Sequence, residues 1–287
     1  MHVIVTGGSS GIGLAVAKAY AARGERVSLI ARDAARLDQA VRDVQAVSKG
    51  GSSFAVSADV SKHEDLAFAV KACETANGPC DVLIASAGIV EPAAFDALSA
   101  AAFDQQITTN LMGTANAARA VYHSMKARGQ GTIMVVSSGA ALIGLHGYAA
   151  YCASKSALKG FAEAVQAEAV GTGIRVSICF PPDTLTPQYQ REITMRPWQA
   201  EVLMGKVKPW TAEAIAQRII AGIDRNRSKI HFTPSLMALA YLGPFIKPLL
   251  SLWYRYRLKR GARETHARSS TVHLKSGISS GIDTPKL

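Results

Sequence analysis

The sequence predicts an α/β fold in which helices cover both faces of a doubly wound parallel sheet. The first observation is an alternation of short apolar runs, rich in β-branched residues, with segments of helical periodicity across residues 1–233. The second is a glycine-rich string, "TGGSSGIG", between the first such run and the first helical segment. Because each crossover between parallel strands places its helix on a sheet face, this alternation predicts a sheet covered on both sides.

Each predicted strand is an apolar run that ends in a turn, and each predicted helix repeats apolar residues at a spacing of three or four. The predicted strands are "VIVT" (3–6), "RVSLIAR" (26–32), "SSFAVSADV" (52–60), "CDVLIASAG" (80–88), "GTIMVVSS" (131–138), "IRVSICF" (174–180) and "KIHFTP" (229–234). The predicted helices are 14–23, 33–47, 63–76, 110–128, one that contains Tyr151, and 211–227.

Two regions depart from this alternation. Residues 182–208 lack a clean period, and a connection of that length is typical of a functional lid. After residue 233 the composition changes. An apolar and then basic segment, "PSLMALAYLGPFIKPLLSLWYRYRLKRGAR", is followed by a Ser/Thr/Gly-rich end. We therefore predict a domain at 1–233, an apolar and basic extension at 234–263 that associates with a membrane or closes a pocket, and a flexible tail at 264–287.

The composition and the N-terminal sequence limit the class of protein that this chain can be. A chain of 287 residues with 48% hydrophobic content can bury a sizeable core and is not disordered throughout. The N-terminus runs directly into a strand pattern without the features of a secretory signal, so a cytoplasmic location is expected. The cysteines lack CxxC or zinc-ligand spacing and predict a reducing compartment; they are Cys73, Cys80, Cys152 and Cys179.

Positive charge is concentrated at the C-terminus. Of the net charge of +11, residues 255–287 contribute +6, from eight Lys/Arg and two Asp/Glu. Such a segment could meet nucleic acid or an anionic membrane surface. Because no recognised nucleic-acid-binding module accompanies it, no nucleic-acid partner is expected.

The glycine string has the spacing GxxxGxG. Its glycines allow positive φ and close approach of the backbone to a diphosphate, which then sits at the N-terminus of the following helix. Its place between the first strand and the first helix predicts a dinucleotide site of Rossmann type. The residues expected to form it are Gly7, Ser9, Ser10, Gly11, Ile12 and Gly13.

The end of the second strand indicates which dinucleotide binds. A carboxylate there would hold the ribose hydroxyls of NAD(H), whereas a basic residue would hold the 2′-phosphate of NADP(H). The sequence places Arg32 at this end, and Asp33 is interpreted as the cap of the next helix. Arg32 could also be an ordinary surface arginine, but the missing carboxylate favours NADPH/NADP.

Tyr151 and Lys155 lie four residues apart at the start of a predicted helix and therefore share one face. A free tyrosine titrates near pH ~10, and a neighbouring ammonium favours the phenolate, which makes the phenol usable for proton transfer near neutral pH. The YxxxK pattern also arises by chance in many helices. Ser138, however, ends the fifth strand at the carboxyl edge of the sheet, where the next helix also begins.

In order and spacing, these motifs resemble the short-chain dehydrogenase/reductase family over nearly all of residues 1–233. The resemblance implies a Rossmann-type fold and a dimer or tetramer. At 86–88 this sequence has Ser-Ala-Gly where the family usually has Asn first, so a side-chain contact would be lost while the backbone role of Ala87 and Gly88 toward the cofactor survives. The matching elements are TGxxxGIG at 6–13, Asp59 and Val60 at the adenine site, the NAG-like 86–88, Asn110, Ser138, Tyr151 and Lys155.

The resemblance also implies a reaction and a set of catalytic residues. The reaction is reversible hydride transfer between the nicotinamide C4 and a carbonyl carbon, without a metal. Tyr151 would be the acid/base. Lys155 would lower the pKa of Tyr151 and contact the ribose. Ser138 would donate a hydrogen bond to the substrate oxygen, and Asn110 would anchor a proton-relay water.

The string "FPPDTLTP" after the sixth strand bears on the substrate. Pro182 stands where the family usually has Gly, which removes a backbone donor and could simply stiffen the turn. The string also resembles the PPDTxTP element of the 3-ketodihydrosphingosine reductases. In the usual pattern of the wider family, Thr184 would contact the carboxamide through its backbone and Thr186 would approach the diphosphate, and Pro181 is also expected to bind the cofactor. The resemblance to the 3-ketodihydrosphingosine reductases implies NADPH-dependent reduction of a long-chain lipid ketone in sphingolipid synthesis. The alternatives are reduction of a 3-oxoacyl thioester, a steroid or a small ketone, or a non-catalytic NADP(H) sensor.

The extension after residue 233 is apolar but interrupted. Pro244, Lys247 and Pro248 break residues 236–254, and a membrane-spanning helix needs about 20 continuous apolar residues, so no full transmembrane helix is expected. Aromatic and basic residues alternate at 253–263, which is typical of an interfacial anchor beside anionic headgroups. We therefore expect residues 236–263 to contact the cytoplasmic face of a membrane peripherally. Alternatively, they pack on a sister subunit or close the substrate pocket.

Overall fold

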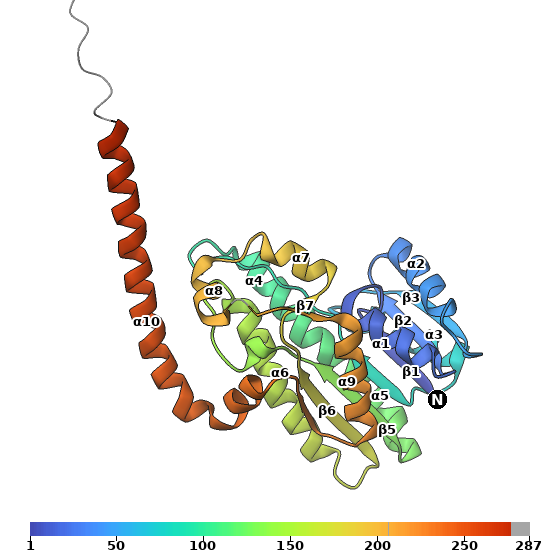
Figure 1. The fold of residues 1–287 in the computed structure, drawn as a ribbon. Helices are drawn as coiled ribbons and strands as arrows, with labels where there is room; N and C mark the ends of the chain where they lie inside the picture. Colours follow the sequence, from blue (N-terminus) through green and yellow to red (C-terminus); the bar gives the residue numbers. More distant parts are fainter. Residues whose placement is uncertain (206, 277–287) are drawn as a thin grey trace, which may run out of the picture.

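The computed structural model describes residues 1–205 and 207–276, with side chains as far as Arg260. Seven parallel strands form one sheet in the order β3-β2-β1-β4-β5-β6-β9 (Figure 1). The chain winds outward in both directions from β1 and β4, which creates a switch point where ligands of such sheets bind. The strands are β1 His2–Thr6, β2 Arg26–Ala31, β3 Ser53–Ser57, β4 Val82–Ala85, β5 Gly131–Val136, β6 Ile174–Phe180 and β9 Lys229–His231.

Helices cover both faces of this sheet, as the sequence predicts. One face is covered by α1 (Gly11–Ala21), α2 (Ala34–Gln45) and α9 (Ala212–Asp224), which bury one apolar cluster against the strands. The other face is covered by α3 (His63–Asn77), α5 (Gly113–Arg128) and α6 (Ala149–Glu168), which bury a second cluster. Both faces of the central strands are therefore dry, which explains why these strands are continuous apolar runs in the sequence.

The helix before the fifth strand is longer than predicted. It begins with α4 (Ala100–Ile107), passes through one π-helical turn, η1 (Thr108–Met112), and continues as α5. The hydroxyl of Ser99 caps its first turn by accepting a hydrogen bond from the backbone nitrogen of Ala102, 3.2 Å away. The predicted helix starts only at residue 110. The residues before it are mostly small or polar and show little apolar periodicity.

The predicted lid contains regular structure. Its elements are β7 (Thr184–Leu185), α7 (Pro187–Ile193) and α8 (Trp198–Met204), and β7 pairs in parallel with β8 (Trp210–Thr211) just after the lid. Thr186 caps α7 by accepting a hydrogen bond from the backbone nitrogen of Tyr189 at 3.1 Å. The two ends of the lid are thus joined by a short ladder.

The C-terminal helix α10 (Pro234–Ser276) continues through Pro244 and Pro248, the residues at which its apolar run is interrupted. Both prolines are exposed, and α10 bends sharply in its first part instead of ending, as is typical where a proline removes a backbone hydrogen bond (Figure 1). By length and composition, residues 234–260 form a helix that could cross a membrane. The expectation of peripheral membrane contact stays a prediction. The helical backbone also extends past residue 263, while residues 277–287 of the predicted tail lie outside the described residues.

The first half of α10 nevertheless lies against the body of the domain. Leu236, Leu239 and Ala240 pack on the apolar cluster that contains α6. Further along, the hydroxyl of Tyr254 donates a hydrogen bond to the carbonyl oxygen of Gln199 in α8, 3.1 Å away. In this arrangement the helix follows the lid as far as residue 254.

Candidate active site

A cavity of about 630 Å³ opens at the carboxyl ends of β5 and β6. It brings together Ser138, which follows β5, and Tyr151, which lies in the first turn of α6. The sequence-predicted cofactor residues Ile12, Pro181, Thr184 and Thr186 line the same cavity. The structure therefore places residues from four separate segments of the chain around one space at the edge of the sheet.

The glycine turn has the geometry that a diphosphate requires. Gly7 and Gly11 have positive φ angles of 68° and 55°, and a Cβ on Gly13 would collide with the carbonyl oxygen of Gly7. Gly11 faces the lid, because a Cβ there would lie 3.0 Å from the Thr186 methyl carbon. The Ser10 side chain does not cap α1, so the first turn of this helix keeps donors for an anion. These residues fit a dinucleotide.

The end of β2 carries a cation beside a carboxylate. Arg32 is exposed there, and Asp33 caps α2, as interpreted from the sequence, by accepting a hydrogen bond from the backbone nitrogen of Arg36 at 3.0 Å. Asp59 accepts hydrogen bonds from the backbone nitrogen and hydroxyl of Ser61, at 3.0 and 2.8 Å. Partial burial opposes ionisation, but the Ser61 hydrogen bonds and the Arg32 charge hold the pKa of Asp59 below its ordinary value.

Asp59 is followed by Val60, whose position depends on α5. Val60 is buried, and its carbonyl oxygen accepts a hydrogen bond from Asn116 Nδ2 at 3.1 Å. Gly113 permits this contact, because a Cβ there would collide with the Val60 side chain. On the other side of the cleft, the backbone nitrogen of Ala87 donates to the hydroxyl of Thr6 at 3.3 Å. Hydrogen bonds and close packing therefore fix the two walls of the expected nucleotide cleft.

Asn110 lies in the π-helical turn and is fully buried. Its side chain accepts a hydrogen bond from the backbone nitrogen of Ile89 at 2.8 Å and donates to the Ile89 carbonyl oxygen at 2.9 Å. It also donates to the hydroxyl of Ser154 in α6 at 2.9 Å. Gly88 allows this packing, because a Cβ there would lie 3.2 Å from both Asn110 Oδ1 and Lys155 Nζ. Asn110 thus joins the loop after β4 to the helix that carries the Tyr-Lys pair.

Lys155 is buried beside Tyr151. Its Nζ lies 5.9 Å from the centre of the Tyr151 ring and donates a hydrogen bond to the carbonyl oxygen of Val136, 3.1 Å away. Burial lowers the pKa of Lys155 to about 8, although the neighbouring Cys179 raises it somewhat. The ammonium is thus held where it loses hydration and gains few partners.

The surroundings of the Tyr151 phenol favour its protonated form. Burial raises the pKa of Tyr151 above its ordinary value, and a hydrogen bond with Ser138 opposes that shift. The carboxylates of Glu192 and Asp183 raise the pKa of Tyr151 further. A protonated phenol beside a serine hydroxyl can supply a proton to an oxygen that enters the cavity.

Sequence reasoning missed a polar network in the lid beside this pair. The hydroxyl of Tyr148 donates to Glu192 Oε1 at 2.6 Å, and Arg196 donates to the same oxygen and to Asp183 Oδ2, each at 2.8 Å. Burial and the Glu192 carboxylate raise the pKa of Tyr148. Asp183 lies within the quoted "PPDTLTP" string, but no local period could have connected it with α7.

The remaining wall of the cavity is apolar and comes largely from α8 and α10. This wall would suit a hydrocarbon chain. The residues involved include Leu203, Met204, Leu236, Leu239, Ile246 and Leu250.

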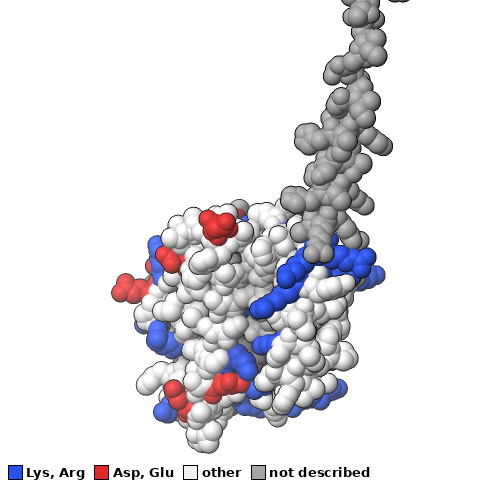
Figure 2. All heavy atoms as spheres, turned by 90° about the vertical axis from the view of Figure 1, so that its left-hand side faces the viewer, with Lys and Arg blue, Asp and Glu red and all other residues white. Residues whose placement is uncertain are grey.

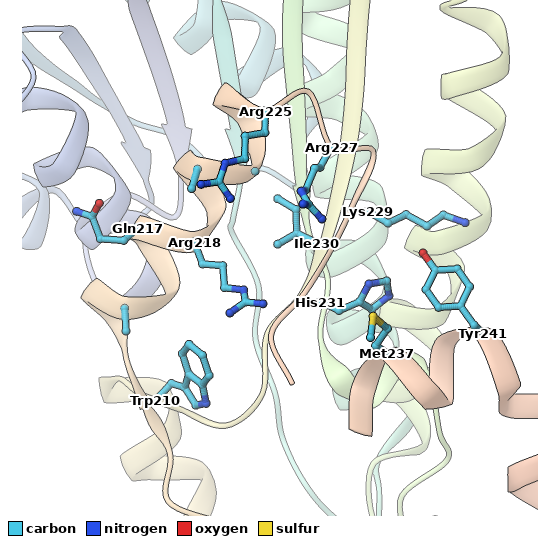
Figure 3. A pocket seen from close by; sticks show the side chains of 13 residues that line it. Trp210, Gln217, Arg218, Arg225, Arg227, Lys229, Ile230, His231, Met237 and Tyr241 are labelled. Atoms are coloured by element: carbon cyan, nitrogen blue, oxygen red, sulfur yellow. The ribbon is translucent and has the colours of Figure 1, made fainter. Parts of the chain in front are cut away.

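A second cavity, of about 640 Å³, lies between α9 and β9. Figure 3 shows Arg218, Arg225 and Arg227 around this space, with Tyr241 of α10 at its rim. Neither Tyr151 nor Ser138 lines it. The two cavities are of nearly equal size, so their side chains, not their volumes, identify the candidate catalytic site.

Comparison with known proteins agrees with this geometry. A sequence profile of the short chain dehydrogenase family matches residues 1–196. The chain is 35% identical to 3-dehydrosphinganine reductase TSC10B of Arabidopsis thaliana over 257 residues, covering 88% of this chain and 76% of the relative. It is 34% identical to 3-dehydrosphinganine reductase of Danio rerio, with the same coverage.

A solved structure shares the fold. The crystal structure of levodione reductase superposes with a TM-score of 0.75 and 23% identity, covering 80% of this chain and 95% of that structure. The two-sided parallel sheet, the glycine turn and the profile match over 1–196 agree with one another. The chain belongs to the short chain dehydrogenase family and is an oxidoreductase that uses a nicotinamide cofactor.

Proposed function

We propose that the chain reduces 3-ketodihydrosphingosine to dihydrosphingosine with NADPH, a step of sphingolipid synthesis. The observation that carries this proposal is the cavity in which Ser138 and Tyr151 meet an apolar wall built from α8 and α10. Such a wall suits a long hydrocarbon chain attached to a reactive carbonyl group. The curated relatives named for this reaction, at 34–35% identity over most of the chain, support the same substrate.

In this proposal, the chain's own residues position and protonate the carbonyl oxygen. Tyr151 donates its phenolic proton to that oxygen, and Ser138 donates a hydrogen bond to it as negative charge develops. Lys155 favours the resulting phenolate and contacts the ribose, while Asn110 holds the loop and helix that frame a proton-relay water. The cofactor, once bound along the glycine turn, supplies the hydride.

The proposed cofactor is NADPH because the end of β2 carries Arg32. An exposed guanidinium at that position can pair with a 2′-phosphate, and Asp33 is already engaged in capping α2. The proposed contacts with the rest of the cofactor are those of the glycine turn and cleft walls. They are Gly7, Ser9, Ser10, Gly11, Ile12, Gly13, Asp59, Val60, Ala87, Gly88, Tyr151, Lys155, Pro181, Thr184 and Thr186.

We further propose that α10 attaches the enzyme peripherally to the cytoplasmic face of a membrane. Phe245, Leu249 and Leu252 are 77%, 73% and 70% exposed, which is unusual for large apolar side chains in water. Figure 2 shows Lys and Arg side chains gathered at the end of the described part of this helix. An exposed apolar face beside clustered cations suits an anionic bilayer surface. Association into a dimer or tetramer also stays a prediction.

A substrate panel tests the proposed reaction. NADPH oxidation would be followed with 3-ketodihydrosphingosine in mixed micelles, an acetoacetyl thioester and a steroid ketone, with products identified by mass. We expect kcat/KM to be highest for 3-ketodihydrosphingosine. Faster turnover of the thioester or the steroid would assign a different carbonyl substrate, and no turnover of any of them would favour a sensor.

A further inference from the structure

We propose that Asp183 and Glu192 form an ammonium-binding subsite, through which the enzyme selects a ketone that carries an amino group on the adjacent carbon. This inference rests on the proposed function, because 3-ketodihydrosphingosine is such a 2-amino ketone. It assigns to the lid a role in recognition that differs from the apolar fit of the hydrocarbon chain.

The two carboxylates are held rigidly in the wall of the catalytic cavity. Both line it together with Tyr151 and Ser138. Arg196 bridges them, with one nitrogen 2.8 Å from Asp183 Oδ2 and another 2.8 Å from Glu192 Oε1. The Arg196 side chain is only 6% exposed, and that of Glu192 only 12%. The charges of this network are therefore poorly screened by water.

The network has an excess of negative charge. Two carboxylates face a single guanidinium, and the Tyr148 hydroxyl adds a hydrogen bond to Glu192 but no charge. Within the described part of the chain, Asp183 Oδ1 and Glu192 Oε2 accept no hydrogen bond. Among the described residues of this network, two acceptor oxygens and one negative charge without a paired cation thus remain. Lys208 also lines the cavity, but it is exposed and its charge is screened.

The two carboxylates line the same cavity as the residues expected to bind the carbonyl oxygen. The charges of Asp183 and Glu192 both act on the Tyr151 phenol, and the Tyr148 ring centre lies 6.3 Å from that of Tyr151. In the proposed substrate, the carbon that bears the ammonium is bonded directly to the carbonyl carbon. When the carbonyl oxygen meets Tyr151 and Ser138, the ammonium therefore has to lie beside these residues, where an unpaired cation would be costly.

A pair of matched substrates tests this proposal. The kcat/KM with NADPH would be measured for 3-ketodihydrosphingosine and for its desamino analogue, 1-hydroxyoctadecan-3-one, in the same micelles. Because a hydrogen bond between charged groups contributes roughly 1.5–3 kcal/mol, we expect the wild-type enzyme to prefer the amino ketone by about 10- to 100-fold. Asp183→Asn and Glu192→Gln should each reduce this ratio about 10-fold, whatever they do to the absolute rates.

The control variant is Glu201→Gln, which removes an exposed carboxylate from α8 in the same lid and should leave the ratio unchanged. A ratio that survives both Asp183→Asn and Glu192→Gln would overturn the proposal and leave the network as a brace for the lid. A wild-type enzyme that reduces both ketones equally well would also overturn it, while the proposed function would stand. Failure to reduce either long-chain ketone, with turnover of a thioester or steroid, would instead contradict the proposed function.

Discussion

The ammonium of Lys155 donates its hydrogen bond to the backbone carbonyl of Val136, 3.1 Å away, at the buried end of β5. This single bond to a neutral acceptor does not restore the hydration that the ammonium loses on burial, which is why the pKa of Lys155 falls to about 8. The residue expected to assist Tyr151 therefore carries a cost in stability.

That cost predicts a pH-dependent stability. Because the folded pKa of Lys155 is about 8 and the unfolded value is near 10.5, the folded chain binds fewer protons between these values, and stability rises with pH across this window. The penalty is fully present below pH ~8 and disappears above ~10.5, and it is on the order of 3 kcal/mol. In urea unfolding, Lys155→Met should remove this rise, whereas exposed Lys71→Met should retain it. Parallel wild-type and Lys155→Met curves between pH 7.5 and 10 would contradict the prediction.

Removal of the Tyr151 hydroxyl should stop catalysis without emptying the cofactor site. Because general acid catalysis contributes about 10²- to 10⁴-fold, Tyr151→Phe should lower kcat by about that factor. NADPH binding, measured by quenching of tryptophan fluorescence, should change by less than about threefold, since the phenol is one contact among many. A kcat within tenfold of the wild type would exclude Tyr151 as the proton donor.

Arg32 should determine the choice between the two nicotinamide cofactors. Loss of a charge-assisted hydrogen bond to the 2′-phosphate costs roughly 1.5–3 kcal/mol, so Arg32→Ala should raise KM for NADPH by about 10-fold or more and change KM for NADH little. Arg36→Ala is the matched control, because Arg36 is also exposed but pairs with Asp33 one turn into α2. Equal increases in KM for both cofactors would argue against a phosphate contact.

The exposed apolar face of α10 should be required for membrane binding. Replacing Phe245, Leu249 and Leu252 together by Glu should release the protein from anionic liposomes in a flotation assay, because these side chains contact little of the reductase body. The control is Phe68→Glu, since Phe68 is equally exposed, at 73%, but lies on α3. Retention of the triple variant on liposomes would exclude this face. Carbonate extraction then distinguishes peripheral attachment from a membrane-spanning helix.

The cavity-facing side of α10 should determine the preference for chain length. Ile246 and Leu250 line the cavity, so introducing Asp at both positions should lower kcat/KM for an 18-carbon ketone by about 10-fold or more. The same change should affect a six-carbon ketone less than about threefold, because its chain ends before it reaches this wall. Equal losses for both substrates would indicate general damage to the site.

The sequence predicted the sheet and the catalytic edge because these depend on local patterns. All five residues of β1 are buried, so its apolar run was visible without any tertiary information. Ser138 and Tyr151 could be placed together because parallel strands end at one edge. The start of α4 at Ala100, however, could not be recognised, because the residues around it do not alternate clearly between apolar and polar side chains.

The lid network could not be predicted because its partners are distant and aperiodic. Asp183 and Arg196 are 13 residues apart, and Tyr148 and Glu192 are 44 residues apart, in segments that share no repeat. The course of α10 could not be predicted because it depends on tertiary contacts. Leu236 and Leu239 are held by packing against the domain, while Pro244 and Pro248 lie exposed within the helix.

The short ladder between β7 and β8 has a consequence for how such an enzyme can diversify. Thr184 pairs with Trp210 and Leu185 with Thr211, so the intervening segment leaves and rejoins the domain at one point. Insertions, deletions or grafts placed between these anchor points would remodel the substrate chamber while the central scaffold keeps its register. A library confined to residues 187–209 is therefore an economical starting point for engineering altered ketone selectivity.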